Sequence, residues 1–442
     1  MTLLLLLGLS AHPAAGQELR SLTLAEAVAE ARENNPNVAI TQARAVGARE
    51  QVTVMGASRW PSLGLEAGVV TSNDPVAAFG GRLRQGRFTE ADFDPAALNG
   101  PDALTDLNAA VALSWAPIDF SRDAALDAAR AGAEAARLGS EWARTVAGYQ
   151  AEVRYLEAAS AELLLESANA ALEAAEENLR LVEERAGEGA ATEADVLQAR
   201  AALEDARARG IKAEQGVADA RGRLGLALGW PVDVVPVPAS ASTTLSADAP
   251  VGSTSSARAD LAASEAQVEA ASATVSRASR ARLPRLEGFA RVEAHSDEAF
   301  DAHGDSWTVG LRVSVPLFTG FELGARKEAA RAELTAATLE HDRLVDEART
   351  TLSEARRGAE SRRRAALAAE ASAEAAEEAA RLLRLRYDEG LATTAELLAA
   401  EAAALRFTNA AVQARLAHRV ARARLLLLDD PRLDHSSEGA NR

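Results

Sequence analysis

The chain has 442 residues, of which 48% are hydrophobic and only 4% aromatic, and its formal net charge is -17. The acidic balance, together with the lack of basic stretches with interleaved aromatics, argues against a nucleic-acid surface. No nucleotide-binding loop occurs, and the absence of cysteine excludes disulfides, thiol catalysis and a lipid on an N-terminal cysteine.

The N-terminus has the order of features that is typical of a secretory signal. Residues 3–9 form an apolar run, and the small residues 14–16 follow it. We expect residues 1–16 to be a signal peptide that is cleaved near Gln17. The alternative is a disordered hydrophobic N-terminus. The positively charged segment that usually opens a secretory signal is missing.

The first half of the chain begins with a predicted helix and a predicted β-hairpin. Residues 21–59 have a helical pattern that starts with Thr23 and Glu26, as in a capping box, and is interrupted at Asn34-Asn35-Pro36. Apolar and polar residues alternate in two later segments, which predicts strands. These strands are expected at residues 63–69 and 106–117, with a long loop over residues 71–105 because glycine, proline, asparagine and aspartate are frequent there.

A long helical hairpin is predicted next. Residues 121–186 contain no proline and are rich in alanine, which favours helix. Leucines at a spacing of seven, each followed three residues later by a small or β-branched residue, predict coiled-coil packing. These residues are Leu165, Leu172 and Leu179, followed by Ala168, Ala175 and Val182. A tight turn at residues 188–192 precedes a second helix over residues 193–228.

The second half repeats this order, which indicates an internal duplication. The expected elements are a helix at 257–281, strands at 286–294 and 307–315, a polar loop at 295–305, a long helix to 387 and a last helix to 428. The two hairpin tips match at a constant offset, for example Gly189 with Gly390 and Leu197 with Leu398. We therefore divide the chain into repeats at 17–228 and 257–428, a linker at 229–256 and a tail at 429–442.

The four strands have the length of tilted strands that cross a bilayer, and each has one apolar face. A soluble sheet packed on helices would also alternate. Four strands cannot close a barrel, and open edges are not tolerated in lipid. Several chains would therefore have to share one barrel. Two copies would give an eight-stranded barrel, whose interior is filled by side chains. Three copies would give a twelve-stranded barrel, which can enclose a channel.

The order helix, β-hairpin and long helical hairpin, present twice, resembles the TolC-like outer-membrane efflux proteins. The most specific matching segments are residues 284–286, 315–320, 189–197 and 390–398. The resemblance implies a mainly α fold with a membrane β-barrel portion: a homotrimer with a 12-stranded barrel in the outer membrane and a helical tunnel in the periplasm. The linker and the tail would form a belt around the tunnel.

The function that this resemblance implies is a passive exit duct of a tripartite efflux pump or a type I secretion system, gated at its periplasmic tip. Its partners would be a periplasmic adaptor, an inner-membrane RND or ABC transporter and outer-membrane lipid. No cofactor is expected. Energy would come from the inner-membrane partner, since the chain has no means of using nucleotide. The sequence does not reveal the cargo.

The resemblance also indicates a gate. Glu396 matches a gate acid of the family, and Asp195 is its counterpart in the first repeat; copies of either would form a ring of like charge. The alternative is that an acid in the first turn of a helix is stabilised there in any case. Tyr387 matches a tyrosine that tethers the closed tip, or it is an ordinary helix-end aromatic. Its usual arginine partner falls at Ala392 and a second gate acid at Ala399, so both are missing.

The tips of the two hairpins are expected to dock onto the adaptor. They consist of Glu188, Gly189 and Thr192 in the first hairpin and Glu389, Gly390 and Thr393 in the second. The glycines permit a tight reversal whatever the function. No catalytic constellation is visible. His295 and His303 lie near acidic residues without a metal-ligand spacing, which favours a solvated loop over a metal site.

Two other protein classes compete with the duct. A periplasmic adaptor is also built on a long helical hairpin, but it normally has one hairpin flanked by compact β domains. A soluble coiled-coil scaffold would explain the alanine-rich helices and leave the amphipathic strands without a purpose. An enzyme fits the sequence least well.

Overall fold

The computed structural model describes residues 18–232, 234–238, 258–298, 304–430 and 433. The expected signal peptide and most of the expected linker and tail lie outside these ranges. The chain packs as two compact units. The first, here the hairpin unit, comprises Met1–Arg44, Arg137–Ala262 and Asp342–Arg442, and the second, here the sheet unit, comprises Ala45–Ala136 and Ala263–His341. Both units draw on both halves of the sequence.

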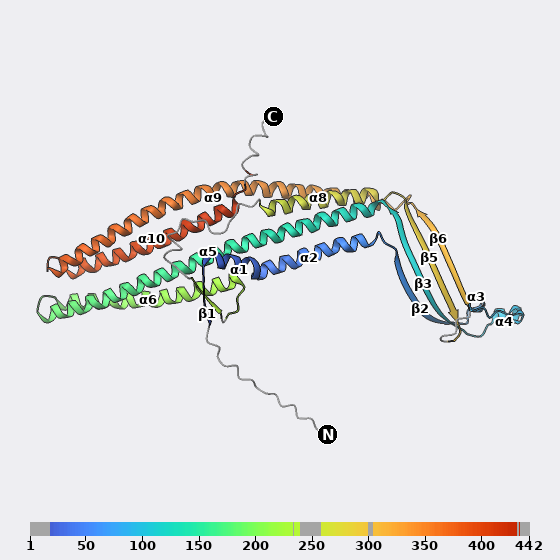
Figure 1. Ribbon diagram of the computed structural model, residues 1–442, viewed down its shortest axis with the longest axis horizontal. Helices are drawn as coiled ribbons and strands as arrows, with labels where there is room; N and C mark the ends of the chain where they lie inside the picture. Colours follow the sequence, from blue (N-terminus) through green and yellow to red (C-terminus); the bar gives the residue numbers. More distant parts are fainter. Residues whose placement is uncertain (1–17, 233, 239–257, 299–303, 431–432, 434–442) are drawn as a thin grey trace, which may run out of the picture. The chain divides into compact units, whose positions relative to one another are not determined.

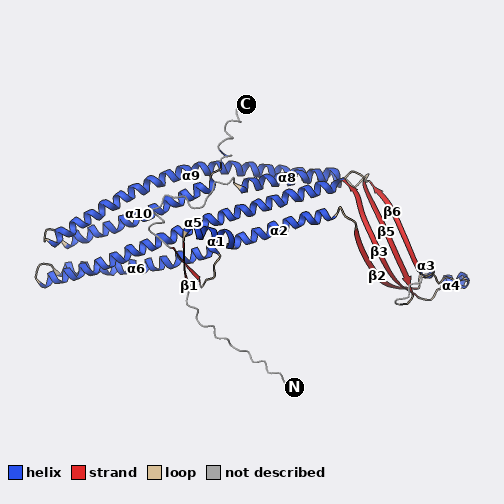
Figure 2. Cartoon of the chain, in the orientation of Figure 1, coloured by secondary structure: helices blue, strands red, loops and turns tan. Residues whose placement is uncertain are grey.

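The sheet unit contains one four-stranded antiparallel sheet in the order β2-β3-β5-β6 (Figures 1 and 2). Its strands are β2 (Ser62–Ser72), β3 (Leu104–Asp119), β5 (Arg285–Ser296) and β6 (Gly304–Ser314). All four predicted strands are confirmed, and each begins or ends a few residues from its predicted bounds. The two hairpins are joined by pairing between β3 and β5, which the alternation pattern alone does not specify.

The register aligns the apolar residues of the four strands in rows on one face. Leu65 lies opposite Val111, Val111 opposite Val292, and Val292 opposite Trp307. Side chains of successive residues point to opposite faces, so this register places polar residues such as Glu66 and Arg291 on the other face. The apolar face is exposed in the single chain. The helices of the described part offer no segment that is both long and apolar enough to cross a membrane.

The expected loop over residues 71–105 is wrong, because this segment folds into short helices. They are α3 (Pro75–Arg84), the 3-10 helix η1 (Glu90–Phe93) and α4 (Pro95–Asn99). Asp74 caps α3 by accepting a hydrogen bond from the N–H of Ala77 at 2.8 Å, and Pro75 occupies the first helical position. Aspartate followed by proline is a helix-start signal. The abundance of turn-forming residues concealed it.

The helical insertion after β2 is anchored to both β-hairpins. The side-chain amide of Gln85 is completely buried and donates to the carbonyl of Thr105 at 2.9 Å and to that of Ser296 at 3.3 Å. Arg87 forms an ion pair with Asp297. These contacts fix the insertion against the end of the sheet that lies farthest from the long helices of the sheet unit (Figure 1).

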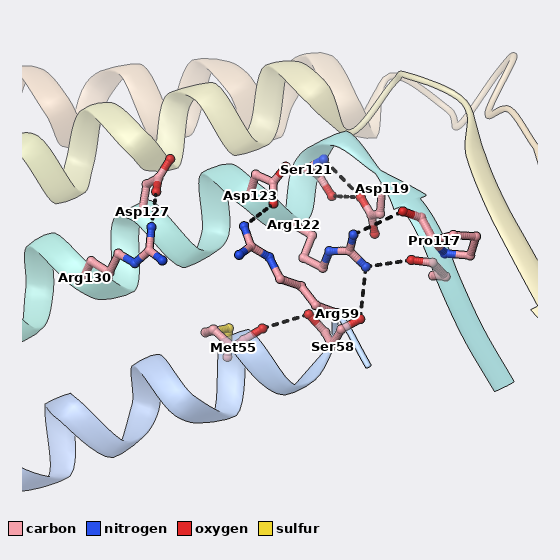
Figure 3. A network of polar contacts seen from close by, with 11 residues as sticks. Met55, Ser58, Arg59, Pro117, Asp119, Ser121, Arg122, Asp123, Asp127 and Arg130 are labelled. Carbon is pink, nitrogen blue, oxygen red and sulfur yellow. Dashed lines mark hydrogen bonds and ion pairs between the residues drawn. The ribbon is translucent and has the colours of Figure 1, made fainter. Parts of the chain in front are cut away.

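The transition from β3 to the long helix α5 (Phe120–Gly187) is held by a polar network (Figure 3). Asp119 accepts hydrogen bonds from the N–H and hydroxyl of Ser121 at 3.0 and 2.7 Å. Arg122 donates to the carbonyl of Ser58 at 3.0 Å, and Arg59 pairs with Asp123 at 2.7 Å. The end of α2 (Pro36–Ala57) is thereby tied to the start of α5.

The hairpin unit contains most of the two predicted helical hairpins, whose long first helices begin in the sheet unit. The first consists of α5 and α6 (Glu193–Leu228), and the second of α9 (Glu322–Asp388) and α10 (Thr394–Leu428) (Figure 1). The predicted coiled-coil spacing is confirmed, because buried Ala175 packs with Leu203 and Ala206 of α6, and Leu172 and Leu179 flank this cluster. The expected helix at 257–281 is α8 (Ala259–Arg280).

A compact core joins the first hairpin to α1 (Leu24–Asn34), whose predicted capping box is confirmed. The core residues are Leu24, Ala27, Val28 and Ala31 of α1 with Ala151, Tyr155, Ala158, Ala220, Leu224 and Leu228 of the hairpin. The amide of Asn35, at the predicted interruption, donates to the carbonyl of Ala227 at 2.8 Å. A small parallel pair, β1 (Glu18–Leu22) with β4 (Val234–Pro238), was not predicted.

Candidate functional site

The two hairpin tips fold in the same way. Gly189 and Gly390 have φ values of 76° and 75°, in the left-handed region that favours glycine. In each tip the N–H of the third residue beyond the helix bonds back to the helix's last turn, from Ala190 to the Arg185 carbonyl at 2.8 Å and from Leu391 to the Arg386 carbonyl at 2.7 Å. This is the usual way in which a left-handed glycine satisfies the final carbonyls of a helix. The glycines are therefore required by the reversal itself.

Asp195 and Glu396 take part in capping boxes. The carboxylate of Glu396 accepts hydrogen bonds from the N–H and hydroxyl of Thr393 at 2.8 and 2.9 Å, and Asp195 accepts the same pair from Thr192 at 2.9 and 2.7 Å. The backbone and hydroxyl bonds from Thr393 lower the pKa of Glu396, and the hydroxyl and backbone bonds from Thr192 lower that of Asp195. Each tip therefore holds an ionised carboxylate in the first turn of a helix, whose dipole favours the negative charge.

Tyr387 is buried between the two hairpins, with 3% of its surface exposed. It packs with Val182 of α5 and with Leu397 of α10, in a cluster that also contains Ala199. Its hydroxyl lies 3.4 Å from the hydroxyl of Thr394. The tyrosine therefore belongs to the contact between the hairpins.

Arg185 provides the partner that Tyr387 lacks at Ala392. Its guanidinium lies 4.0 Å from the centre of the tyrosine ring and donates to the Tyr387 carbonyl at 2.8 Å. The stacking of a cation on an aromatic face and the hydrogen bond act together across the two hairpins. The equivalent arginine of the second tip, Arg386, donates within its own turn, to the carbonyl of Leu391 at 3.1 Å, and its charge also contributes to the lowered pKa of Glu396. Sequence reasoning missed Arg185, although its place near the tip was a usable signal.

A second polar contact joins the hairpins farther from the tips. Arg384 of α9 donates to the side-chain oxygen of Asn178 of α5 at 2.8 Å, and it pairs with Glu401 of α10. Asn178 is 2% exposed and also donates to Glu401. These side chains line a groove of about 700 Å³ between the hairpins. The only sequence signal for this contact was an asparagine next to a coiled-coil seam.

Glu152 is a buried acid on α5, and sequence reasoning did not identify it. It is 8% exposed, and burial raises its pKa to about 7 despite the attraction of Arg419, Arg32 and Arg422. Burial also raises the pKa of Tyr149, one turn away. The carboxyl of Glu152 therefore changes its charge near neutral pH, unlike the two acids at the tips.

The predicted polar loop at 295–305 is wrong for its first residues, because His295 lies in β5 and is buried. Its Nδ1 is 2.8 Å from a carboxylate oxygen of Asp106 on β3. His303 lies outside the described residues. Among the residues that the structure describes, no group of three acidic, histidine or cysteine side chains could hold a metal ion.

A family model described as "Outer membrane efflux protein" matches residues 27–230 and 252–429. The chain is similar to a membrane protein from Pseudomonas aeruginosa, with 22% identity, 92% coverage of both chains and a TM-score of 0.77. It is also similar to the CmeC outer membrane channel of Campylobacter jejuni, with 18% identity, 92% and 85% coverage and a TM-score of 0.75. It is similar as well to the open state of the MtrE outer membrane channel of Neisseria gonorrhoeae, with 20% identity, 92% coverage of this chain, 88% coverage of that chain and a TM-score of 0.72. A search among curated protein sequences gave no match.

Proposed function

The chain belongs to the outer membrane efflux protein family, and we propose that it works as a homotrimer whose hairpin tips form a periplasmic gate. Membership of the family makes the chain an exit duct of the outer membrane with its helical part in the periplasm. The four-stranded sheet and the two long hairpins are the parts from which such a duct is built. The duct is passive, and its energy comes from an inner-membrane RND or ABC transporter.

The exposed apolar face and the two open edges of the sheet support the trimer. Strand edges carry unpaired N–H and carbonyl groups. Burying one such group in hydrocarbon without a hydrogen-bond partner costs on the order of several kcal/mol. Strands β2 and β6 are the edges of the sheet. If β6 of each copy pairs with β2 of the next, no edge is left. Three copies then supply twelve strands, enough to enclose a channel.

The contacts at the tips support the gate. Arg185 and Tyr387 hold the two hairpins of a chain together, and the capping boxes fix Asp195 and Glu396 as ionised groups. Three copies of each acid around one axis would attract cations and make closure costly, because like charges would approach one another. The contact of Arg185 with Tyr387 would oppose that repulsion within each chain.

The remaining assignments are part of the same proposal. The adaptor docks at the tips, on Glu188, Gly189 and Thr192 of the first hairpin and on Glu389, Gly390 and Thr393 of the second. We keep the ranges 17–228 and 257–428 as two structural repeats, 229–256 as the linker and 429–442 as the tail. An adaptor and a soluble scaffold are the functions that the experiment below must exclude.

The test is conductance in planar bilayers, measured on detergent-purified protein whose particle size is determined first. We expect long-lived channels from a trimer-sized species. Glu396→Gln removes the charge and keeps a capping residue, so it should reduce cation preference without loss of thermal stability. Glu396→Ala removes both the charge and the capping side chain. It should therefore reduce cation preference and also lose roughly 1 kcal/mol of helix stabilisation. A monodisperse, water-soluble protein that never inserts would contradict the duct, and unchanged selectivity in Glu396→Gln would remove that residue from the gate.

Arg185→Ala should increase the fraction of time for which the channel is open. The substitution removes the cation that stacks on Tyr387 and a donor to its carbonyl, which together stabilise the contact by roughly 1–3 kcal/mol. Single-channel recording measures the open fraction directly. The matched control is Arg386→Ala, because the equivalent arginine of the second tip hydrogen-bonds to the Leu391 carbonyl of its own turn. Equal behaviour of the two variants would show that Arg185 does not hold the gate.

A further inference from the structure

The turn between β6 and α9 exposes large apolar side chains in the single chain. Leu317, Phe318 and Phe321 are 93%, 77% and 82% exposed. The two phenylalanine rings lie edge to face with their centres 5.6 Å apart. Isolated exposed apolar residues are common, but a cluster of this kind marks a contact site. We call these three residues the aromatic turn.

The aromatic turn also has a strained backbone. Phe321 has a φ of 70°, and within the described residues it is the only non-glycine with a positive φ. A bulky side chain rarely adopts this conformation, because its Cβ crowds the backbone. Strain of this kind persists only where surrounding contacts impose it. The exposed faces of the aromatic turn indicate that such contacts come from outside the chain.

The first half of the chain shows how the equivalent turn is covered. Asp119 lies opposite Arg285, the first residue of β5, and their side chains are 3.7 Å apart. Arg122 on the same turn reaches Ser58 at the end of α2 (Figure 3). The turn after β3 is therefore covered on one side by the start of the neighbouring strand and on the other by the preceding helix.

The internal duplication relates this arrangement to the turn after β6. Pro117 corresponds to Pro316, so Asp119 corresponds to Phe318. Pro284 corresponds to Pro61, so Arg285 corresponds to Ser62. Ser62 begins β2, at the opposite edge of the same sheet from β6. Within one chain the two edges are separated by β3 and β5, so only a second copy can place Ser62 beside Phe318.

We propose that the aromatic turn of one copy packs against the entry to β2 of the next copy, on Trp60 and Leu63. This inference rests on the proposed trimer, and the turn continues directly from the β6 edge that the trimer pairs. Trp60 is 76% exposed and precedes β2 at the end of the sheet where β6 finishes. Apolar side chains that are uncovered in each copy thereby cover one another.

The pairing of β3 with β5 also supplies a register for the seam between copies. In β3 the register shifts between Trp115 and Ile118, which accounts for one extra residue before Pro117. When that residue is left out of the alignment, Leu113 corresponds to Val313 and Ala290 corresponds to Ala67. The pair Leu113–Ala290 therefore predicts that Val313 of one copy lies opposite Ala67 of the next. In the same way, Val111–Val292 becomes Leu311 opposite Val69. This register places Val313, Leu311, Ala67 and Val69 on one face, as a membrane strand requires.

Cysteine cross-linking tests the proposal, because the chain contains no cysteine. The informative variant combines Ser62→Cys with Phe318→Cys in the full chain, in native outer-membrane vesicles. It is oxidised with copper phenanthroline, or bridged with a short bis-methanethiosulfonate, and run on a non-reducing gel. We expect most of the protein to shift to dimer and trimer size, because the corresponding pair Asp119 and Arg285 face each other in the register of β3 with β5, and residues that face each other in this way are within disulfide reach. Each single variant should remain at monomer size.

Two further pairs distinguish failure of this inference from failure of the proposed trimer. Asp119→Cys with Arg285→Cys should cross-link within one chain, without a size shift. This result would show that cysteines at the equivalent positions of the first half can form the cross-link. Val69→Cys with Leu311→Cys tests the seam itself. If the seam pair cross-links between copies and Ser62→Cys/Phe318→Cys does not, the trimer stands and the aromatic turn faces lipid, which overturns this inference. If neither pair links and the protein is monomeric by size, the proposed trimer fails.

Discussion

We expect the protein to lose stability as pH rises from about 4.5 to about 7, and we expect Glu152→Gln to remove most of this loss. In the folded chain burial raises the pKa of Glu152 to about 7 from 4.5. The folded state therefore binds the proton more tightly than the unfolded state, so protonation favours folding. The free energy of unfolding is highest below the unfolded pKa, falls through this interval and levels off above it. At about 1.4 kcal/mol per pKa unit, the change is on the order of 3 kcal/mol per chain.

Thermal unfolding followed by circular dichroism at pH 5 and pH 8 measures this effect. The wild type should have a lower midpoint at pH 8, and the difference should largely vanish in Glu152→Gln. Glu173→Gln, at an exposed glutamate of the same helix, is the matched control and should keep the wild-type difference. If the midpoints of Glu152→Gln and the control depend on pH in the same way, Glu152 ionises at an ordinary pH in the folded protein.

Gly229→Ala is expected to destabilise the hairpin unit by roughly 2–4 kcal/mol, the range of substitutions that combine backbone strain with overpacking. Gly229 ends α6 with a φ of 72°. A Cβ at this position would lie 2.3 Å from the carbonyl oxygen of Asn34 and 3.1 Å from the ring of Pro36. Both neighbours are rigid parts of the junction between α1 and α2, so neither can turn aside as a flexible side chain would.

The control for this prediction is Gly216→Ala in the same helix. A Cβ at Gly216 meets no atom within 4 Å, and alanine favours helix over glycine by up to about 1 kcal/mol. Gly216→Ala should therefore unfold at or above the wild-type temperature, and Gly229→Ala well below it. Equal midpoints for the two variants would mean that the junction around Asn34 adjusts without cost.

The parts of the fold that the sequence predicts are those with a local signal. Each of these signals involves residues that are close together in the sequence. They are the alternation around Val111 and Trp307, the heptad spacing around Leu172 and the capping box at Thr23. The structure contains all three. The helices α3 and α4 also had a local signal, aspartate before proline, but the turn-forming composition around it was given more weight.

The parts that the sequence did not predict depend on contacts between distant segments. The parallel pair β1–β4 joins a five-residue strand at the start of the first repeat to a five-residue strand in the linker, and no short-range pattern indicates such pairing. Arg185 was missed because the family pattern placed the partner of Tyr387 on the same hairpin. The buried position of Asn178 depends on Arg384 and Glu401, which lie on the other hairpin. Such positions become visible only when the two hairpins are packed together.

The contact between Arg185 and Tyr387 lies within one chain, and this has a consequence for kinetics. Loss of the contact in one copy leaves the same contact intact in its neighbours. Each copy would then release its tip independently, and a trimeric duct would open in discrete steps. Single-channel records should accordingly contain intermediate current levels, whose lifetimes shorten in Arg185→Ala. A lock formed between neighbouring copies would instead couple the three tips and favour one all-or-none transition.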